Sequence, residues 1–239
     1  MTAKVTSQKQ QTCERVKKGD YCAVVDRCFC DPAQFCEFVK NIDGLMCNGQ
    51  IIKSLKGSRS TYVARLWWND KDILVKRYNY KGFVHSFRHT LKKSRARHSW
   101  IYSHRLRTLS VPTPKPLGYV EMYWGPFLKK SYFISEYLDA QSLYDYLQDS
   151  PTSKEQSLCI ASKVGHLLQQ MQKHKIFHGD LKLQNFLLKD EAVIVDLDRM
   201  RAHKWNWMYR FWRRKDLARL RRYVQKYPAF ATIIRRWIV

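Results

Sequence analysis

The sequence has few of the features that direct a chain out of the cell or across a membrane. Its first twenty residues are polar and charged, so no secretory signal is expected. No uninterrupted apolar run approaches the roughly 20 residues that a spanning helix needs. There is no Cys-x-x-Cys pair, and the cysteine spacing matches no familiar zinc site. We therefore expect the protein to be in a reducing cytosol. Six cysteines precede residue 48, and we expect them to be free thiols, with a zinc site as the alternative: Cys13, Cys22, Cys28, Cys30, Cys36 and Cys47.

Acidic residues are also scarce. The chain carries 20 Asp and Glu against 44 Lys and Arg, a formal net charge of +24. No acidic residue occurs between Asp72 and Glu121, and from Arg199 onward the only one is Asp216. A solvated surface explains a single basic residue, but two long stretches almost without acids indicate a polyanionic partner. Nucleic acid, an anionic membrane face and a phosphorylated glycan or lipid all fit this charge.

The remaining composition, 45% hydrophobic and 14% aromatic, is typical of a packed globular protein. The order of the expected strands and helices predicts the α+β class. We predict a flexible arm over 1–19, a strand-rich part over 20–136 and a mainly helical part over 137–239. Asp31 and Pro32 indicate an N-cap and first helical residue of a helix reaching about residue 41. A basic helix is expected within 85–109, and three prolines make 111–116 extended. Strands are expected at 21–25, 50–56, 62–68, 72–78, 117–121 and 131–136, and Asn69-Asp70 is expected to form the turn between 62–68 and 72–78.

The segment His178–Asn185 carries the strongest functional signal. It fits the kinase catalytic-loop pattern H-x-D-x-x-x-x-N, in which the Asp, here Asp180, accepts the proton of the substrate hydroxyl. Asn185 matches the residue that holds a magnesium ion, and Lys182 can neutralise charge on the transferred phosphoryl group. An amphipathic helix should precede this loop, because Thr152-x-x-Glu155 matches a capping box before an apolar face at helical spacing.

A second carboxylate follows at a suitable distance along the chain. Residues 186–188 and 192–195 read as a hairpin, and Asp196 stands at the end of its second strand. This is the position of the magnesium-binding aspartate of the kinase D-F-G motif, although Leu197 and Asp198 replace its Phe and Gly. We therefore assign Asn185 and Asp196 to Mg²⁺, and Asp180 and Lys182 to catalysis.

Residues for ATP are expected in the strand-rich part. Lys76 ends the apolar run Ile73–Lys76, which is similar to the V-A-I-K strand whose Lys pairs with the α- and β-phosphates. Gly57 and Ser58 lie in a turn whose backbone N–H groups can cover the phosphates. Glu136, at the start of a connector to the helical part, is also assigned to nucleotide binding.

These segments give the chain a resemblance to the kinase-like superfamily, and within it to the bacterial lipopolysaccharide core kinases that phosphorylate heptose or Kdo sugars. The residues that carry it are His178–Lys182 with Asn185, the run 193–199, the linker 111–117 and the segment 216–222, and the similarity covers roughly residues 50 to 225. The resemblance implies a bilobal kinase-like fold with ATP and Mg²⁺ as cofactors. It also implies a sugar hydroxyl of the lipid-anchored core oligosaccharide as acceptor, and work at the cytoplasmic face of the inner membrane, without a spanning helix.

One position departs from that family. Its members commonly have Glu where this chain has Ser99, although kinases pair the strand Lys with a Glu of the following helix. Lys76 must therefore do without that partner, use Glu121 or a more remote acid, or belong to a protein with weakened catalysis.

The C-terminal run 205–212 combines aromatic and basic residues. Its rings either pack against the helical part or anchor the protein at a lipid interface, with arginines on the phosphates. Docking of the substrate by Arg199 and Arg201 is a related hypothesis.

Three further functions compete with a lipopolysaccharide core kinase. A kinase-fold enzyme acting on an antibiotic or metabolite is one, although a pocket for cationic drugs should be acidic. A pseudokinase or other binding module is the second, suggested by Ser99 and by the replaced Phe and Gly. A nucleic-acid-binding protein is ranked last, because no nucleic-acid-binding motif accompanies the charge. The oligomeric state is left open.

Overall fold

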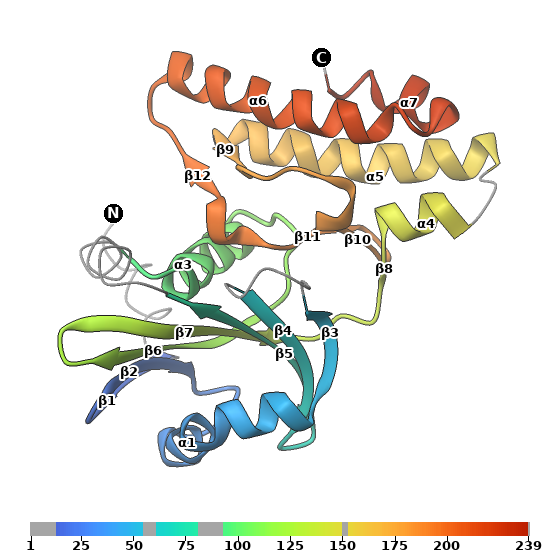
Figure 1. Cartoon of the computed structure of the whole chain (residues 1–239). Helices are drawn as coiled ribbons and strands as arrows, with labels where there is room; N and C mark the ends of the chain where they lie inside the picture. The colour runs from blue at the N-terminus through green and yellow to red at the C-terminus, as the bar shows by residue number, and fades with distance from the viewer. Residues whose placement is uncertain (1–12, 55–60, 81–92, 150–152, 239) are drawn as a thin grey trace, which may run out of the picture. The chain divides into compact units, whose positions relative to one another are not determined.

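The computed structural model describes residues 13–54, 61–80, 93–149 and 153–238, so Gly57 and Ser58 lie outside the described residues. The chain forms two compact units. The first unit is built on an antiparallel sheet and the second is mainly helical, which confirms the predicted α+β class (Figure 1). Residues 102–114, which the sequence placed in the first part, belong to the second unit together with 138–239, because Leu106 and Val111 pack in its core.

The sheet of the first unit has the order β1-β2-β6-β7-β5-β4-β3, and each neighbouring pair is antiparallel. The predicted turn at Asn69-Asp70 joins β4 to β5, and both residues have the positive φ that a tight two-residue hairpin requires. The strands are β1 (Cys13–Lys18), β2 (Tyr21–Asp26), β3 (Gln50–Ser54), β4 (Thr61–Trp68), β5 (Lys71–Asn79), β6 (Pro116–Trp124) and β7 (Phe127–Glu136).

Strand β1 corrects the prediction of a flexible arm for residues 13–19, while residues 1–12 of that arm lie outside the described residues. Cys13–Lys18 pairs along its whole length with β2, and Gly19 makes the turn with φ of +56°. The strand is at the edge of the sheet, so its polar residues face solvent and hide the alternating pattern that marks a half-buried strand.

Helix α1 (Pro32–Asn48) covers one face of this sheet. The expected cap is confirmed, since the Asp31 side chain accepts hydrogen bonds from the backbone N–H groups of Ala33 and Gln34. The helix runs seven residues beyond the expected end at residue 41 because its apolar stripe continues to Met46. The stripe packs on Ile73, Val75 and their neighbours in the sheet. Asp43, on the same helix, accepts hydrogen bonds from Arg77 and Tyr132.

Helix α3 (Arg95–Thr108) supplies the residues that cover the other face. Ala96 and Trp100 pack with Tyr78 and Tyr119. Successive side chains of a strand point to opposite faces of the sheet. Tyr78 is an odd number of residues from Ile73 and Val75 along β5, so its side chain lies on the other face. Lys76 is two residues from Tyr78 on β5, so its side chain lies on the same face of the sheet, the one that α3 covers.

The second unit surrounds one apolar core. Helices α4 (Leu143–Asp149), α5 (Lys154–Lys173), α6 (Asn206–Val224) and α7 (Pro228–Ile234) pack with the predicted hairpin, β10 (Phe186–Leu188) and β11 (Ala192–Ile194). Strand β8 (Gln141–Ser142) pairs with β10, and β9 (Ile176–Phe177) pairs with β12 (Arg201–Ala202).

The amphipathic helix predicted before the catalytic segment is α5, and its expected face, including Ile160, Val164 and Met171, is buried. The predicted capping box is wrong by one residue. Ser153 and Gln156 form it, with both reciprocal hydrogen bonds present, and Thr152 lies outside the described residues. Within the described residues, no helix combines the length and apolar character that crossing a bilayer requires.

Candidate active site

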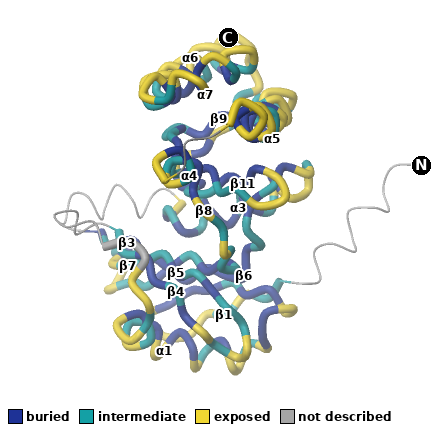
Figure 2. Tube along the Cα trace, turned by 90° about the vertical axis from the view of Figure 1, so that its right-hand side faces the viewer, coloured by how far each residue is buried: buried dark blue, intermediate teal, exposed yellow. Residues whose placement is uncertain are grey.

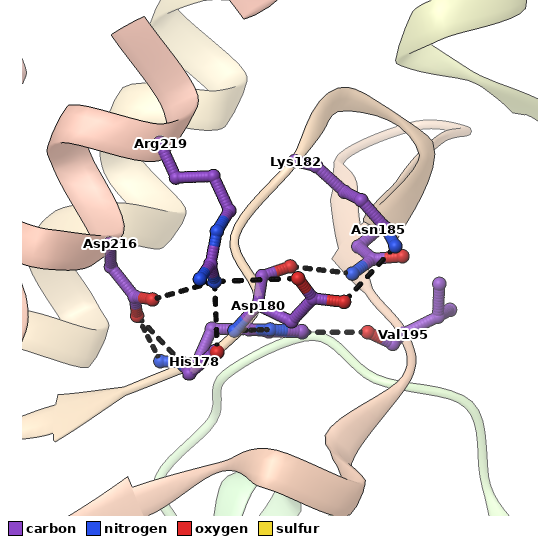
Figure 3. Close-up of polar contacts among 8 residues, drawn as sticks. His178, Asp180, Lys182, Asn185, Val195, Asp216 and Arg219 are labelled. Carbon is purple, nitrogen blue, oxygen red and sulfur yellow. Dashed lines mark hydrogen bonds and ion pairs between the residues drawn. The ribbon is translucent and has the colours of Figure 1, made fainter. Parts of the chain in front are cut away.

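The loop 178–185 leaves β9 and ends in the short 3-10 helix Leu183–Asn185, directly before β10. Figure 3 shows that its polar side chains converge with residues from α6 and from the end of β11. All of these elements belong to the second unit, so the arrangement is set by the packing of that unit.

Gly179 has a backbone conformation that other residues rarely adopt. Its φ is +80°, and a Cβ atom built there would lie 2.5 Å from the carbonyl oxygen of Arg199. Because both the dihedral angle and the close backbone exclude a side chain, glycine is required between His178 and Asp180.

Asp216 holds the beginning of the loop from α6. Its Oδ2 accepts hydrogen bonds from the backbone N–H groups of His178, at 2.6 Å, and Gly179, at 2.9 Å. The residue is only 4% exposed. Two charge-assisted hydrogen bonds to a buried carboxylate fix the path of the backbone that presents Asp180.

The fully buried His178 connects the loop with the segment that leads to Asp196. Its Nδ1 accepts a hydrogen bond from the backbone N–H of Asp180 at 3.3 Å, so Nε2 carries the proton of the neutral ring and donates to the carbonyl oxygen of Val195 at 2.8 Å. The ring therefore links the backbone of Asp180 to that of Val195, the residue before Asp196.

The carboxylate of Asp180 lies between two cations. Lys182 Nζ is 3.0 Å from Oδ2, and Arg219 Nη1 is 3.3 Å from Oδ1. Arg219, on α6, also donates to the carbonyl oxygen of Gly179 at 2.9 Å. The predicted pair Asp180 and Lys182 is thus brought together, and Arg219 joins it. The carboxylate side chain is 25% exposed, so it is accessible for proton transfer while two positive groups surround it.

Asn185 and Asp196 lie at the same end of the hairpin. Phe186, which follows Asn185, pairs with Ile194, two residues before Asp196, and the backbone N–H of Val195 donates to the carbonyl oxygen of Asn185. The Asn185 Nδ2 donates to the carbonyl oxygen of Asp180 at 2.9 Å, which fixes its carboxamide.

Asp196 is in the left-handed region, with φ of 66° and ψ of 55°, a strained conformation that is common at functional sites. One amide and one carboxylate oxygen donor fit Mg²⁺, which usually takes few protein ligands and completes its shell with water and phosphate. In the part of the chain that the structure describes, no group of three His, Cys, Asp or Glu side chains forms a metal site from protein ligands alone. The seven cysteines all lie in the described residues, and none of them forms a disulfide.

In the first unit, Lys76 is half-buried near the middle of β5, opposite Val63 on β4 and Phe133 on β7. Its Nζ lies 5.4 Å from the centroid of the Tyr78 ring. Ser99, on α3, is buried, and its Oγ is 3.4 Å from the Tyr78 hydroxyl.

Glu121, one proposed partner of Lys76, is two strands away on β6. Glu121 pairs with Ser131 of β7, which in turn pairs with Tyr78 of β5. Its carboxylate accepts a hydrogen bond from the Tyr123 hydroxyl.

Glu136 has a structural role at the end of β7. Its Oε1 accepts a hydrogen bond from the backbone N–H of Lys115 at 2.6 Å, and its own N–H donates to the Lys115 carbonyl oxygen. Nucleotide binding by Glu136 stays a prediction.

Sequence reasoning missed the contacts of Asp216 and Arg219 with the loop. A signal for Asp216 was present, since it is the only acidic residue from Arg199 onward. An isolated acid in a basic helix is a candidate for a buried, hydrogen-bonded role. Arg219 stands among many arginines, and nothing in the sequence distinguishes it.

The chain is similar to known proteins in sequence and in fold. The model of the lipopolysaccharide kinase (Kdo/WaaP) family matches residues 46–234. The lipopolysaccharide core heptose(I) kinase WaaP of Escherichia coli (strain K12) is 31% identical over 129 residues, and the match spans about half of each protein, 49% of this chain and 49% of the relative. A solved structure, WaaP in complex with acyl carrier protein, superposes with a TM-score of 0.57 at 19% identity, covering 82% of this chain and 81% of the other. That likeness shows that the two chains share a kinase-like fold.

Proposed function

The chain belongs to the lipopolysaccharide kinase (Kdo/WaaP) family, and from this premise we propose that it transfers the γ-phosphate of ATP to a hydroxyl group of the lipopolysaccharide core. The acceptor sugar is a heptose or Kdo of the inner core, presented at the cytoplasmic face of the inner membrane. The observation that carries the proposal is the Asp180 carboxylate held between Lys182 and Arg219, on a loop that Asp216 and His178 fix in place.

In this proposal Asp180 accepts the proton of the attacking sugar hydroxyl. The backbone is held at Gly179 by Asp216 and at the carbonyl oxygen of Asp180 by Asn185, so the carboxylate is oriented before the acceptor arrives, which lowers the reorganisation needed during transfer. Lys182 stabilises negative charge on the phosphoryl group in transit.

Asn185 and Asp196 would hold Mg²⁺, which neutralises charge on the phosphates when it is bound. Lys76, in the first unit, would bind the α- and β-phosphates, with Gly57 and Ser58 assigned to the same phosphates. The exposed Arg199 and Arg201 follow Asp196, and we assign them to anionic groups of the core oligosaccharide.

A phosphate-transfer assay tests this function. Purified core oligosaccharide and labelled ATP are incubated with the parent protein, with Asp180→Ala, and with the matched control Asp190→Ala, which changes an exposed aspartate in the turn between β10 and β11. We expect phosphate incorporation by the parent and the control, and a loss of about 10²- to 10⁴-fold for Asp180→Ala. Mass spectrometry of lipopolysaccharide from cells with and without the gene then identifies the sugar.

A binding module without catalysis is the second candidate. It is favoured by Ser99, whose hydroxyl contacts Tyr78 where the family commonly has the Glu that pairs with the strand Lys. ATP binding by the parent without transfer to any core sugar, and with no change on Asp180→Ala, would support this candidate and reject the kinase proposal.

A further inference from the structure

Four aromatic side chains at the beginning of α6 are exposed. Trp205 is 66% exposed, Trp207 70%, Phe211 50% and Trp212 39%. They account for half of the eight large exposed hydrophobic residues in the described part of the chain, although they lie within eight consecutive positions. We refer to these four residues as the aromatic patch.

The patch is on the side of α6 that the core of the second unit does not use. The helix is anchored by the opposite side, where Tyr209, Leu217, Leu220 and Val224 are buried. Figure 2 shows much of α6 in the colour of exposed residues. Trp205, Trp207 and Phe211 therefore contribute little to folding, and the alternative that the rings pack into the helical part is wrong for these three.

The rings are ordered among themselves. Trp205 and Trp207 are stacked with 6.5 Å between their centroids, and Phe211 meets Trp212 edge-on at 5.5 Å. Lys215 Nζ lies 4.3 Å from the Phe211 ring centroid, which couples a cation to the aromatic surface. A preformed apolar surface loses little conformational entropy when it is covered.

The charge around the patch is of one sign. Arg210, Arg214, Lys215 and Arg222 are exposed on the same helix. The only acid of the helix, Asp216, is buried and accepts hydrogen bonds from the catalytic loop. An occupant of this surface must therefore offer anionic groups together with an apolar phase.

An anionic bilayer has both properties at the depth where they are needed. Trp rings prefer the interface between headgroups and acyl chains, and Arg and Lys side chains reach the lipid phosphates. A protein partner would need an acidic rim around an apolar centre, and a second copy of this positively charged surface would repel it.

The patch is also continuous with the candidate active site. The ring of Trp212 stacks on that of Phe177 at 5.7 Å and 5°. Phe177 directly precedes His178, the first residue of the catalytic loop. A contact at the patch would thus hold this loop close to a lipid surface.

We propose that the aromatic patch and the basic residues of α6 form an interfacial anchor that docks the second unit on an anionic lipid bilayer. The rings enter the headgroup region and the arginines and Lys215 bind lipid phosphates. The anchor deepens the proposed function by explaining how a lipid-linked acceptor is reached, but it does not depend on which sugar is phosphorylated.

Sedimentation with vesicles tests the anchor. The vesicles contain either equal parts of phosphatidylcholine and phosphatidylglycerol or phosphatidylcholine alone. Because any protein of net charge +24 adsorbs to anionic vesicles, binding is measured at low salt and at about 1 M salt, where charges are screened within about 3 Å. Vesicles with brominated acyl chains report ring insertion through quenching of Trp fluorescence.

The ring variant is Trp205→Gln/Trp207→Gln/Phe211→Gln, which leaves Trp212 on Phe177. We expect its partition to anionic vesicles at high salt to fall by on the order of 30-fold, and its quenching to be lost. The matched control is Trp67→Gln/Trp124→Gln, which removes two comparably exposed tryptophans of the first unit and should bind like the parent.

The charge variant is Arg210→Gln/Arg214→Gln/Arg222→Gln. We expect it to lose about fivefold in low-salt partition per residue while keeping the high-salt component. Unfolding curves check that each variant is folded.

Vesicle binding and quenching equal to the parent in the ring variant would overturn the anchor. So would failure of the parent to bind anionic vesicles, or a ring variant that changes only self-association or binding to a protein. Transfer to lipid-free oligosaccharide should be the same in parent and ring variant, so a failed kinase proposal and a failed anchor give different results.

Discussion

Arg219 Nη1 lies 3.3 Å from the Asp180 carboxylate and 2.9 Å from the carbonyl oxygen of Gly179. One guanidinium of α6 thus contacts both the predicted catalytic base and the backbone that carries it (Figure 3). Both contacts are made by the same nitrogen of a planar guanidinium, whose N–H bonds have fixed directions, whereas a lysine ammonium is a compact charge on a flexible stem.

We predict that Arg219 positions Asp180. Arg219→Lys keeps the charge but loses the planar donor that makes both contacts, so transfer to oligosaccharide should fall about tenfold in kcat with little change in the KM for ATP. Arg222→Ala, an exposed arginine of the same helix, should leave both parameters unchanged. An Arg219→Lys protein with parental kcat would show that the contact has no positioning role.

Removal of the Asp216 carboxylate should disrupt both folding and transfer. Asp216→Ala leaves the buried N–H groups of His178 and Gly179 without their acceptor, at a cost of about 1–3 kcal/mol each in the free energy of unfolding. Urea denaturation measures this loss. Asp190→Ala is the control and should unfold like the parent. A stable Asp216→Ala protein with full transfer would contradict the assigned role.

Substitution of Gly179 by alanine tests the close approach to Arg199. The left-handed dihedral alone costs about 1–2 kcal/mol, and the contact of the new Cβ with the Arg199 carbonyl oxygen adds to it. Gly125→Ala has a similar positive φ in open space, so it separates the two contributions. Equal losses of stability for the two variants, measured by thermal unfolding, would show that the loop yields to the side chain.

The pH dependence of stability should reveal the contribution of Asp43, whose hydrogen bonds attach α1 to the sheet. Burial alone would raise the pKa of Asp43, but hydrogen bonds from Lys130, Tyr132 and Arg77 outweigh it and lower the pKa. A folded-state pKa below the unfolded value gives stability that is present above the unfolded pKa of about 4 and is lost as the pH falls through the folded value.

The measurement compares the free energy of unfolding of the parent and of Asp43→Asn between neutral and acidic pH. We expect the variant to be less stable at neutral pH, with a difference that shrinks as the medium becomes acidic. A difference that is constant with pH would exclude the titration of Asp43 as its source. Asp190→Asn serves as the exposed control.

Much of the architecture was readable from local patterns. The Asp31 cap, the Asn69-Asp70 turn and the hairpin around residue 190 each depend on a few neighbouring residues, and each is confirmed. The strand Cys13–Lys18 was missed because an edge strand has no fully buried face to produce a pattern. The cap of α5 was misplaced by one residue because Thr152 and Ser153 are both suitable N-cap types.

The candidate site divides in the same way. Asp180, Lys182 and Asn185 lie within six residues of one another, so the spacing of the chain already brings them together, and the hairpin carries Asp196 back to Asn185. Asp216 is 38 residues from His178 and meets it through the packing of α6 on the core, a contact that depends on the burial of Leu217, Leu220 and Val224. The exposure of Trp205 and Trp207 has the same origin, because the choice of which side of α6 turns inward results from competition among all of its apolar residues for one core. Contacts between residues that are close in the sequence can be predicted from the sequence alone. The partners of Arg219 and the exposed surface of α6 depend on the packing of the whole second unit.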